Sequence, residues 1–138
     1  MRRVLLVLLV LVGLLSVGVG PAISAPPGKV SVDIRPKATI SADGLNAVAR
    51  VRVRCPSQPP VLEAFMYITQ EGNESQFAGL NLTCDGRWHR MAVSVDAFEE
   101  APLHPGRANA TAFILLCDET TGECIDGQDS RRIFLREA

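Results

Sequence analysis

The stretch from Asn46 to Cys55 reads NAVARVRVRC and alternates small or aliphatic side chains with arginines. One parity holds Ala47, Ala49, Val51, Val53 and Cys55, and the other holds Arg50, Arg52 and Arg54. Successive side chains of a β-strand point to opposite faces, so this segment would present one apolar face and one cationic face. The pattern predicts a half-buried β-strand.

The same alternation recurs along the rest of the chain. The predicted strands are Lys29–Pro36 with its continuation Ala38–Ser41, Asn46–Cys55, Val61–Gln70, Gln76–Cys84, Trp88–Phe98, Arg107–Cys117 and Arg131–Arg136. Turn-forming pairs such as Asp43-Gly44 and Asp85-Gly86 separate them, and no stretch has the pattern of a long amphipathic helix. Short strands at this spacing predict an all-β fold, a two-sheet antiparallel sandwich of seven or eight strands in one domain.

The first 25 residues have the layout of a secretory signal peptide, which leaves residues 26–138 as the folded domain. Arg2 and Arg3 precede an apolar run, and small residues follow a Gly-Pro break, so cleavage is expected after Ala22 or Ala25. The alternative is an uncleaved membrane anchor, but the run is shorter than the roughly 20 residues that span a bilayer. The chain is therefore expected to be secreted or extracytoplasmic, with membrane association only if the leader stays attached.

Composition limits the class of partner. Of 138 residues, 47% are hydrophobic and 21% are charged, which is typical of a folded chain. Without Arg2 and Arg3, 12 basic residues face 15 acidic ones, a net charge of −3, so no nucleic-acid partner is expected. Two lysines against 12 arginines favour a bacterial source, in which the glycosylation sequons at Asn73, Asn81 and Asn109 would stay unused.

Four cysteines in a small exported domain predict two disulfides, and four cysteines allow three pairings. Cys55 and Cys84 share a face with the apolar residues of their predicted strands, so both should point inward. Cys117 and Cys124 flank a short, hairpin-like connection. We therefore expect the pairs Cys55–Cys84 and Cys117–Cys124. The chain lacks a CxxC motif, so neither a zinc ribbon nor a thioredoxin-like redox site is indicated.

Two stretches give the chain a wider resemblance. AVARVRVRC (Ala47–Cys55) would be a second strand, and HPGRANATAF (His104–Phe113) would be a proline-glycine turn that enters a sixth strand. In this pattern, which spans nearly all of the chain after the leader, the sequence resembles the immunoglobulin-like and fibronectin-III-like sandwiches of secreted bacterial proteins. The resemblance implies that the third, sixth and seventh strands share one sheet.

That arrangement predicts a binding surface on the outer face of this sheet. Polar residues of each strand mark which parity faces outward, among them Glu63 and Thr69 in the third strand and Asn109 in the sixth. The apolar members of the outward parity are Phe65, Tyr67, Phe113, Leu115 and Phe134. A solvated sheet face should alternate to polar, so these residues indicate an interaction site. The alternatives are a β-bulge that reverses the parity, or a loop such as Glu71–Leu80 that covers the patch.

No catalytic constellation is recognisable. Neither His89 nor His104 lies in a nucleophile motif, and GxSxG, phosphate-binding glycine loops and copper-ligand spacings are absent from the sequence. The acidic segment Asp118–Asp129 matches no calcium-loop spacing and is read as a solvated loop. We therefore expect no enzyme activity, no metal and no cofactor.

The leading expectation is a secreted, non-enzymatic module that binds a protein or a glycan through the apolar sheet face. The alternatives are a small-molecule carrier, an enzyme or metal protein that uses one of the histidines, and a self-associating structural protein of the cell envelope. The arginine face of the second strand, with Arg35 and Arg90, could bind an anionic polymer or lipid headgroup. The preferred interpretation of that face is a solvated surface, balanced by Asp33 and Asp96.

Overall fold

The computed structural model describes residues 28–138, and the signal peptide predicted for residues 1–25 lies outside them. Every regular element of the described part is a β-strand, so the all-β prediction is confirmed. The strands in chain order are β1 (Ser31–Ile40), β2 (Asn46–Arg54), β3 (Val61–Gln70), β4 (Asn73–Glu74), β5 (Ala78–Gly79), β6 (Trp88–Asp96), β7 (Gly106–Cys117) and β8 (Cys124–Glu137). Within residues 28–138 there is no helix long and apolar enough to cross a membrane.

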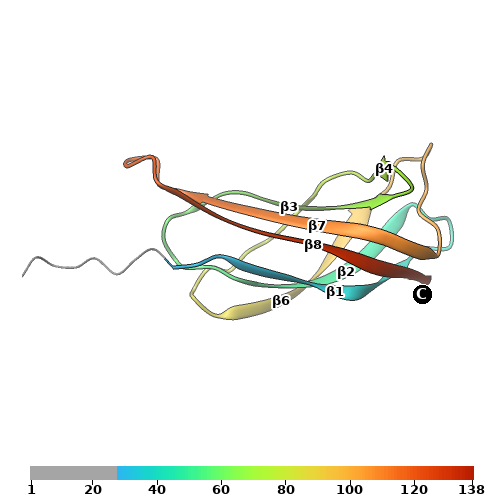
Figure 1. Cartoon of the computed structure of the whole chain (residues 1–138), viewed down its shortest axis with the longest axis horizontal. Coiled ribbons are helices and arrows are strands. Elements are labelled where there is room, and N and C mark those ends of the chain that lie inside the picture. Colours follow the sequence, from blue (N-terminus) through green and yellow to red (C-terminus); the bar gives the residue numbers. More distant parts are fainter. Residues whose placement is uncertain (1–27) are drawn as a thin grey trace, which may run out of the picture.

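The strands form one curled, mixed sheet in the order β4-β3-β7-β8-β1-β2-β6, with β5 paired to β3. In Figure 1, β3, β7 and β8 lie in one layer above β1, β2 and β6. Strand β1 joins the two halves: it is antiparallel to β2 along most of its length, and its last residues, Lys37–Ile40, run parallel to β8. After an irregularity in the β1–β2 register between Ile34 and Ala38, β1 is still paired with β2 and has β8 as its neighbour on the other side.

The core lies between the two halves of the curled sheet and contains the inward parity predicted for each strand. On β2, the apolar parity of NAVARVRVRC is almost fully buried. On β7, small residues alternate inward before two large ones, and Met66 and Ile68 of the neighbouring strand β3 lie beside Ala112 and Ala110 on the same inner face. The inward residues of β7 are Ala108, Ala110, Ala112, Ile114 and Leu116. Burial of this continuous apolar surface is the main stabilising contribution expected for the fold.

Three details of the predicted strands are wrong. In the predicted strand Gln76–Cys84, only Ala78–Gly79 (β5) is a strand, paired with β3. The segment lies between β3 and β6: Gln76 N donates to Asp96 O at 2.9 Å, and Leu80 N donates to Ala64 O at 3.1 Å. Leu62, expected inside, is 59% exposed, because the β3–β7 register shifts between Val61 and Glu63. The last strand, predicted as Arg131–Arg136, is longer than predicted, because β8 pairs with β7 from Cys124 onward.

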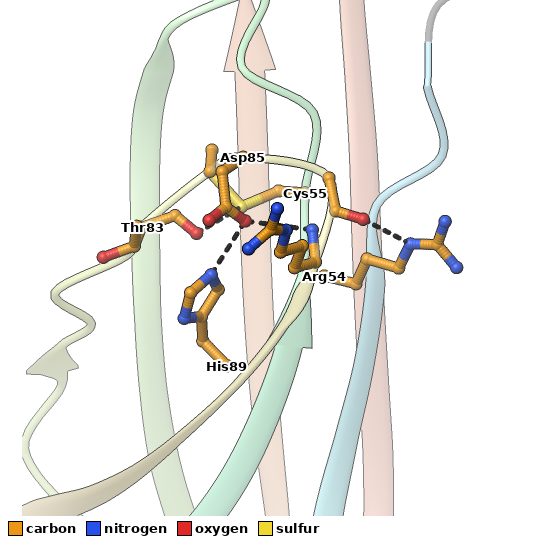
Figure 2. The surroundings of a disulfide bond; sticks show 8 residues. Arg54, Cys55, Thr83, Asp85 and His89 are labelled. Atoms are coloured by element: carbon orange, nitrogen blue, oxygen red, sulfur yellow. Dashed lines mark hydrogen bonds and ion pairs between the residues drawn. A yellow bond between two sulfur atoms is a disulfide. The ribbon is translucent and has the colours of Figure 1, made fainter.

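Both predicted disulfides are present. Cys55 and Cys84 are joined across 29 residues with their Cα atoms 4.7 Å apart, and Cys117 and Cys124 across 7 residues with their Cα atoms 4.1 Å apart. Figure 2 shows how a polar loop closes over the first bridge. Gly86 N donates to Cys55 O at 2.8 Å, and Arg54 Nε donates to Gly86 O at 2.8 Å. The bridge and these bonds fasten the loop before β6 to the end of β2.

Candidate functional site

Four aromatic rings gather on the outer face of β3 and β7, and we call them the aromatic cluster: Phe65, Tyr67, Phe77 and Phe113. The ring centroids of Phe65 and Phe113 are 5.6 Å apart, and those of Phe65 and Tyr67 are 6.3 Å apart with the planes 27° from parallel. Phe77 meets Phe65 at 5.1 Å and Tyr67 at 5.3 Å, edge-on in both cases. These separations are those of attractive aromatic pairs.

Strand register explains the positions of three of these rings. Phe65 lies directly opposite Phe113 in the antiparallel β3–β7 pair, and Tyr67 lies opposite Thr111, two residues further along the same face. The inner face at these levels is occupied by Met66 and Ala112, which are fully buried. The three rings are half-buried, which leaves part of each available to a ligand.

The fourth ring comes from the segment between β4 and β5. Ser75 anchors that segment: its backbone N donates to Ile68 O at 2.8 Å, and its hydroxyl accepts from Ile68 N at 2.9 Å. Phe77 then turns back onto the sheet and is itself 62% exposed. Sequence reasoning allowed that the segment Glu71–Leu80 could cover the patch. The segment covers it only in part and adds a ring to it.

The remaining two predicted residues lie at different distances from the cluster. Leu115 is half-buried on the same face, opposite Glu63 of β3 and Asp126 of β8. Phe134 also faces outward and is 51% exposed, but it lies opposite Arg107. The strand residue at the level of Phe113 is Gln128, six positions earlier in β8, which corresponds to about 20 Å. Phe134 is therefore separate from the aromatic cluster.

Polar side chains border the cluster on the β8 side. The strand register places exposed Asn109, Gln128 and Ser130 on the same outward parity. Thr111 Oγ1 and Ser130 Oγ are 3.0 Å apart and hydrogen-bonded. The surface therefore offers aromatic rings beside amide and hydroxyl groups. That combination can form both stacking contacts and hydrogen bonds with a polar ligand.

Of the two carboxylates expected to balance the arginine face of β2, Asp33 pairs with Arg52, whereas Asp96 accepts from Asn46 Nδ2 at 2.8 Å. Arg52 Nε donates to Asp33 Oδ2 at 2.7 Å, and its guanidinium carbon lies 4.7 Å from the centre of the Trp88 ring. Asp33 also pairs with Arg131 at 3.0 Å. The hydrogen bond from Arg52 is the main cause that lowers the pKa of Asp33 below its ordinary value, so this carboxylate stays charged in moderately acidic solution.

Each histidine lies beside one carboxylate. His89 Nε2 is 2.8 Å from Asp85 Oδ1 (Figure 2), and the hydrogen bond from His89 lowers the pKa of Asp85. His104 Nε2 is 3.1 Å from Glu71 Oε2, and the hydrogen bond to Glu71 raises the pKa of His104. In the described residues, no serine, threonine or cysteine side chain forms a hydrogen bond with either ring. Each histidine therefore pairs with a carboxylate of a neighbouring turn or loop, and neither pair includes a hydroxyl or thiol group.

The acidic segment Asp118–Asp129, predicted as a loop, is a tight turn only over residues 118–123, because its remainder belongs to β8 and pairs with β7. The Asp118 carboxylate accepts from Thr120 N at 2.8 Å and from Thr121 N at 3.3 Å, while Asp118 N donates to Glu123 O at 2.8 Å. Both bonds go to Asp118 Oδ1, so this oxygen holds the backbone of the turn. Among residues 28–138, no three histidine, cysteine or acidic side chains are grouped in a way that could hold a metal ion.

Comparison with known proteins gives little. No protein-family model matches the sequence, and no curated protein matches it. One solved structure that resembles the fold is the crystal structure of Spo0M, a sporulation control protein from Bacillus subtilis, with 18% sequence identity and a TM-score of 0.41. The match covers 80% of this chain and about half, 50%, of the Spo0M chain. A likeness at this level leaves the function to be argued from the chain's own residues.

Proposed function

We propose that this chain is a secreted, immunoglobulin-like binding module that recognises a protein or a glycan through the aromatic cluster and catalyses no reaction. The observation that carries the proposal is the cluster itself: four rings within 6.3 Å of a neighbour, on a sheet face that a solvated strand would make polar. Export is supported by the two disulfides, which persist in oxidising compartments.

The strand order supports the immunoglobulin-like part of the proposal. The third long strand in the chain, β3, pairs with β7, which pairs with β8, while β2 pairs with both β1 and β6. This is the grouping that the sequence resemblance implied for the two layers of a sandwich. In such domains the outer face of the layer that contains β3, β7 and β8 is free to meet a partner.

The expected free energy of covering the aromatic cluster supports a role in ligand binding. Apolar surface left in water forgoes roughly 25 cal/mol for each Å² that a partner could cover. Rings that are already packed against one another lose little side-chain entropy when a ligand covers them, so more of that energy appears as affinity. Aromatic residues are for this reason common at the centres of binding sites.

The decisive experiment compares two double variants. Phe65→Ser/Phe113→Ser removes the centre of the cluster, and Phe98→Ser/Phe134→Ser removes two exposed aromatic rings that lie outside it. Each purified chain is tested for capture of extracellular proteins and for binding to a panel of glycans. Circular dichroism and thermal unfolding verify that both variants are folded. We expect the first variant to lose at least about tenfold in affinity, the effect of about 1.4 kcal/mol, and the second to bind as the native chain does.

Equal binding by native chain and cluster variant would refute the proposal. Self-association is the competing outcome: sedimentation would then show a concentration-dependent dimer of the native chain that Tyr67→Glu dissociates, because a charge cannot be buried unpaired between two copies. That result would mean that the aromatic cluster mediates self-association of the chain and does not recognise a separate ligand.

A further inference from the structure

A basic trough crosses the outer face of β1, β2 and β6, away from the aromatic cluster. It consists of two adjoining hollows of about 310 Å³ and 500 Å³ that share Arg35 and Arg50 in their walls. Arg52 and Arg90 complete the charged wall of the first hollow, and Lys37 and Arg136 that of the second. Because Arg35 and Arg50 line both hollows, a ligand that lies across these two side chains would contact both.

The charge in this trough is largely uncompensated. Neither hollow has a carboxylate in its lining. Of the six cationic side chains, Arg52 alone forms an ion pair within residues 28–138, with Asp33 at 2.7 Å. The β2–β6 register also sets Arg52 directly opposite Arg90, an arrangement of like charges that destabilises a sheet.

This concentration of positive charge contrasts with the acidic balance of the whole domain. After Arg2 and Arg3 are set aside, 12 basic residues face 15 acidic ones, and six of those 12 line the trough. A local cationic surface on an acidic protein raises the nearby concentration of anions and steers them to one place. Repulsion among the arginines would be relieved by an anionic ligand.

The shape of the trough favours a chain-like anion. Along β2 it extends from Val48 to Arg52, which corresponds to about 13 Å, further than one phosphate group reaches. The lining contains no aromatic ring on which a nucleobase could stack, and the neighbouring Trp88 ring already has the Arg52 guanidinium 4.7 Å from its centre. A planar bilayer would meet the rim of the depression before its floor, whereas a flexible chain can lie inside it.

We propose that the basic trough binds a linear polyanion with closely repeated phosphate groups and no bases. The guanidinium groups of Arg35, Arg50 and Arg90 would each donate two hydrogen bonds to successive phosphates, a geometry for which arginine is suited. Lys37 and Arg136 would hold the next phosphates as the polymer leaves over the end of β1. This site is independent of the aromatic cluster, so the two can be tested separately.

The test uses inorganic polyphosphate as the probe, with the purified full chain. Binding is measured by fluorescence anisotropy of end-labelled polyphosphate at several salt concentrations. The trough variant is Arg35→Gln/Arg50→Gln/Arg90→Gln. The matched control, Arg87→Gln/Arg107→Gln/Arg132→Gln, removes the same charge from exposed arginines outside the trough. Orthophosphate, single-stranded DNA with an equal number of phosphates, and vesicles of anionic phospholipid serve as competitors.

We expect the trough variant to bind polyphosphate about tenfold more weakly than native chain, the loss expected for three solvent-exposed charge contacts, and the control to change by less than about threefold. Native binding should weaken steeply with salt, and the trough variant should show a shallower salt dependence. Polyphosphate should outcompete DNA and orthophosphate. The proposal is overturned by equal loss in both variants, by tighter binding of DNA, by displacement with vesicles alone, or by absence of polyphosphate binding to the native chain.

Discussion

Removal of the two disulfides one at a time should destabilise the chain by unequal amounts. One variant is Cys55→Ala/Cys84→Ala and the other is Cys117→Ala/Cys124→Ala. The first bridge closes a loop of 29 residues and the second a loop of 7. In the chain-entropy model, a bridge stabilises the folded state because it restricts the unfolded chain, and the restriction grows with the length of the loop.

The loop lengths give the magnitudes. The model predicts a loss of about 3.6 kcal/mol in the free energy of unfolding without Cys55–Cys84, and of about 2.4 kcal/mol without Cys117–Cys124. Burial widens the difference, because Cys55 is 1% exposed and Cys124 is exposed, so the first variant also loses packed sulfur atoms from the core. The gap between the variants should therefore be at least about 1.2 kcal/mol.

Urea unfolding followed by far-ultraviolet circular dichroism measures both values, and the slopes must be compared to verify that each variant unfolds in two states. Mass spectrometry after alkylation confirms that the remaining bridge is intact. If the Cys117–Cys124 variant proved the less stable of the two, loop length and burial would not be what decides the contribution of these bridges.

Four further predictions concern single positions. Gly127→Ala should destabilise the chain by about 1–3 kcal/mol, because the added carbon would lie 2.5 Å from Val30 Cγ1. The control is Gly79→Ala, whose added carbon would meet nothing within 4 Å. Equal thermal midpoints of the two variants would contradict this prediction. Phe77→Ala should lower the free energy of unfolding by about 1 kcal/mol through its edge-on contacts with Phe65 and Tyr67, and the loss should vanish in a Phe65→Ala/Tyr67→Ala background. The pKa of the His104 ring, measured by NMR, should lie above 6.5 and return toward that value in Glu71→Gln. Because the pKa is raised in the folded state, the His104–Glu71 pair stabilises the fold below pH 6.5, and this stabilisation is lost as the pH rises through the folded pKa. Asp33→Asn should lower the free energy of unfolding by about 1 kcal/mol at neutral pH. Because the pKa of Asp33 is lowered in the folded state, the stabilities of native chain and variant should converge as the pH falls through that pKa. A stability difference that stays constant down to strong acid would exclude the charge as the cause.

Alternation in the sequence predicted which face of each long strand is buried, because a strand inside one domain has one side in the core and the other in water. NAVARVRVRC is the clearest instance: its alanines, valines and cysteine are buried and its arginines point away from the core. The Cys55–Cys84 pair followed from the same reasoning, since parity placed both residues on the inner side, whereas the Cys117–Cys124 pair followed from the short connection between its two residues.

Parity could not predict how far one strand slides along another. Phe134 has the outward parity of Phe113, yet the β7–β8 register separates the two by about 20 Å. A single inserted residue has a similar effect, as the register shift that exposes Leu62 demonstrates.

A local sequence pattern could not predict the path of the segment between β3 and β6 either. Its backbone bonds go to Ile68, Asp96 and Ala64, residues on both sides of the crossing, so its course depends on strands that are distant in the sequence. Phe77 belongs to this segment, and the only indication of its role was a large aromatic residue in a polar stretch.

The parallel pair of β1 and β8 has a mechanical consequence. The chain enters the domain through β1 and leaves it through β8, and their paired residues, from Lys37–Phe134 to Ile40–Glu137, lie side by side in the same direction. Tension applied to the two ends pulls these strands past each other, so the slanted bonds of the pair are loaded together rather than opened one after another. Such a pairing slows rupture under load, so the domain is expected to unfold more slowly when pulled by its ends than a domain whose terminal strands open one bond at a time.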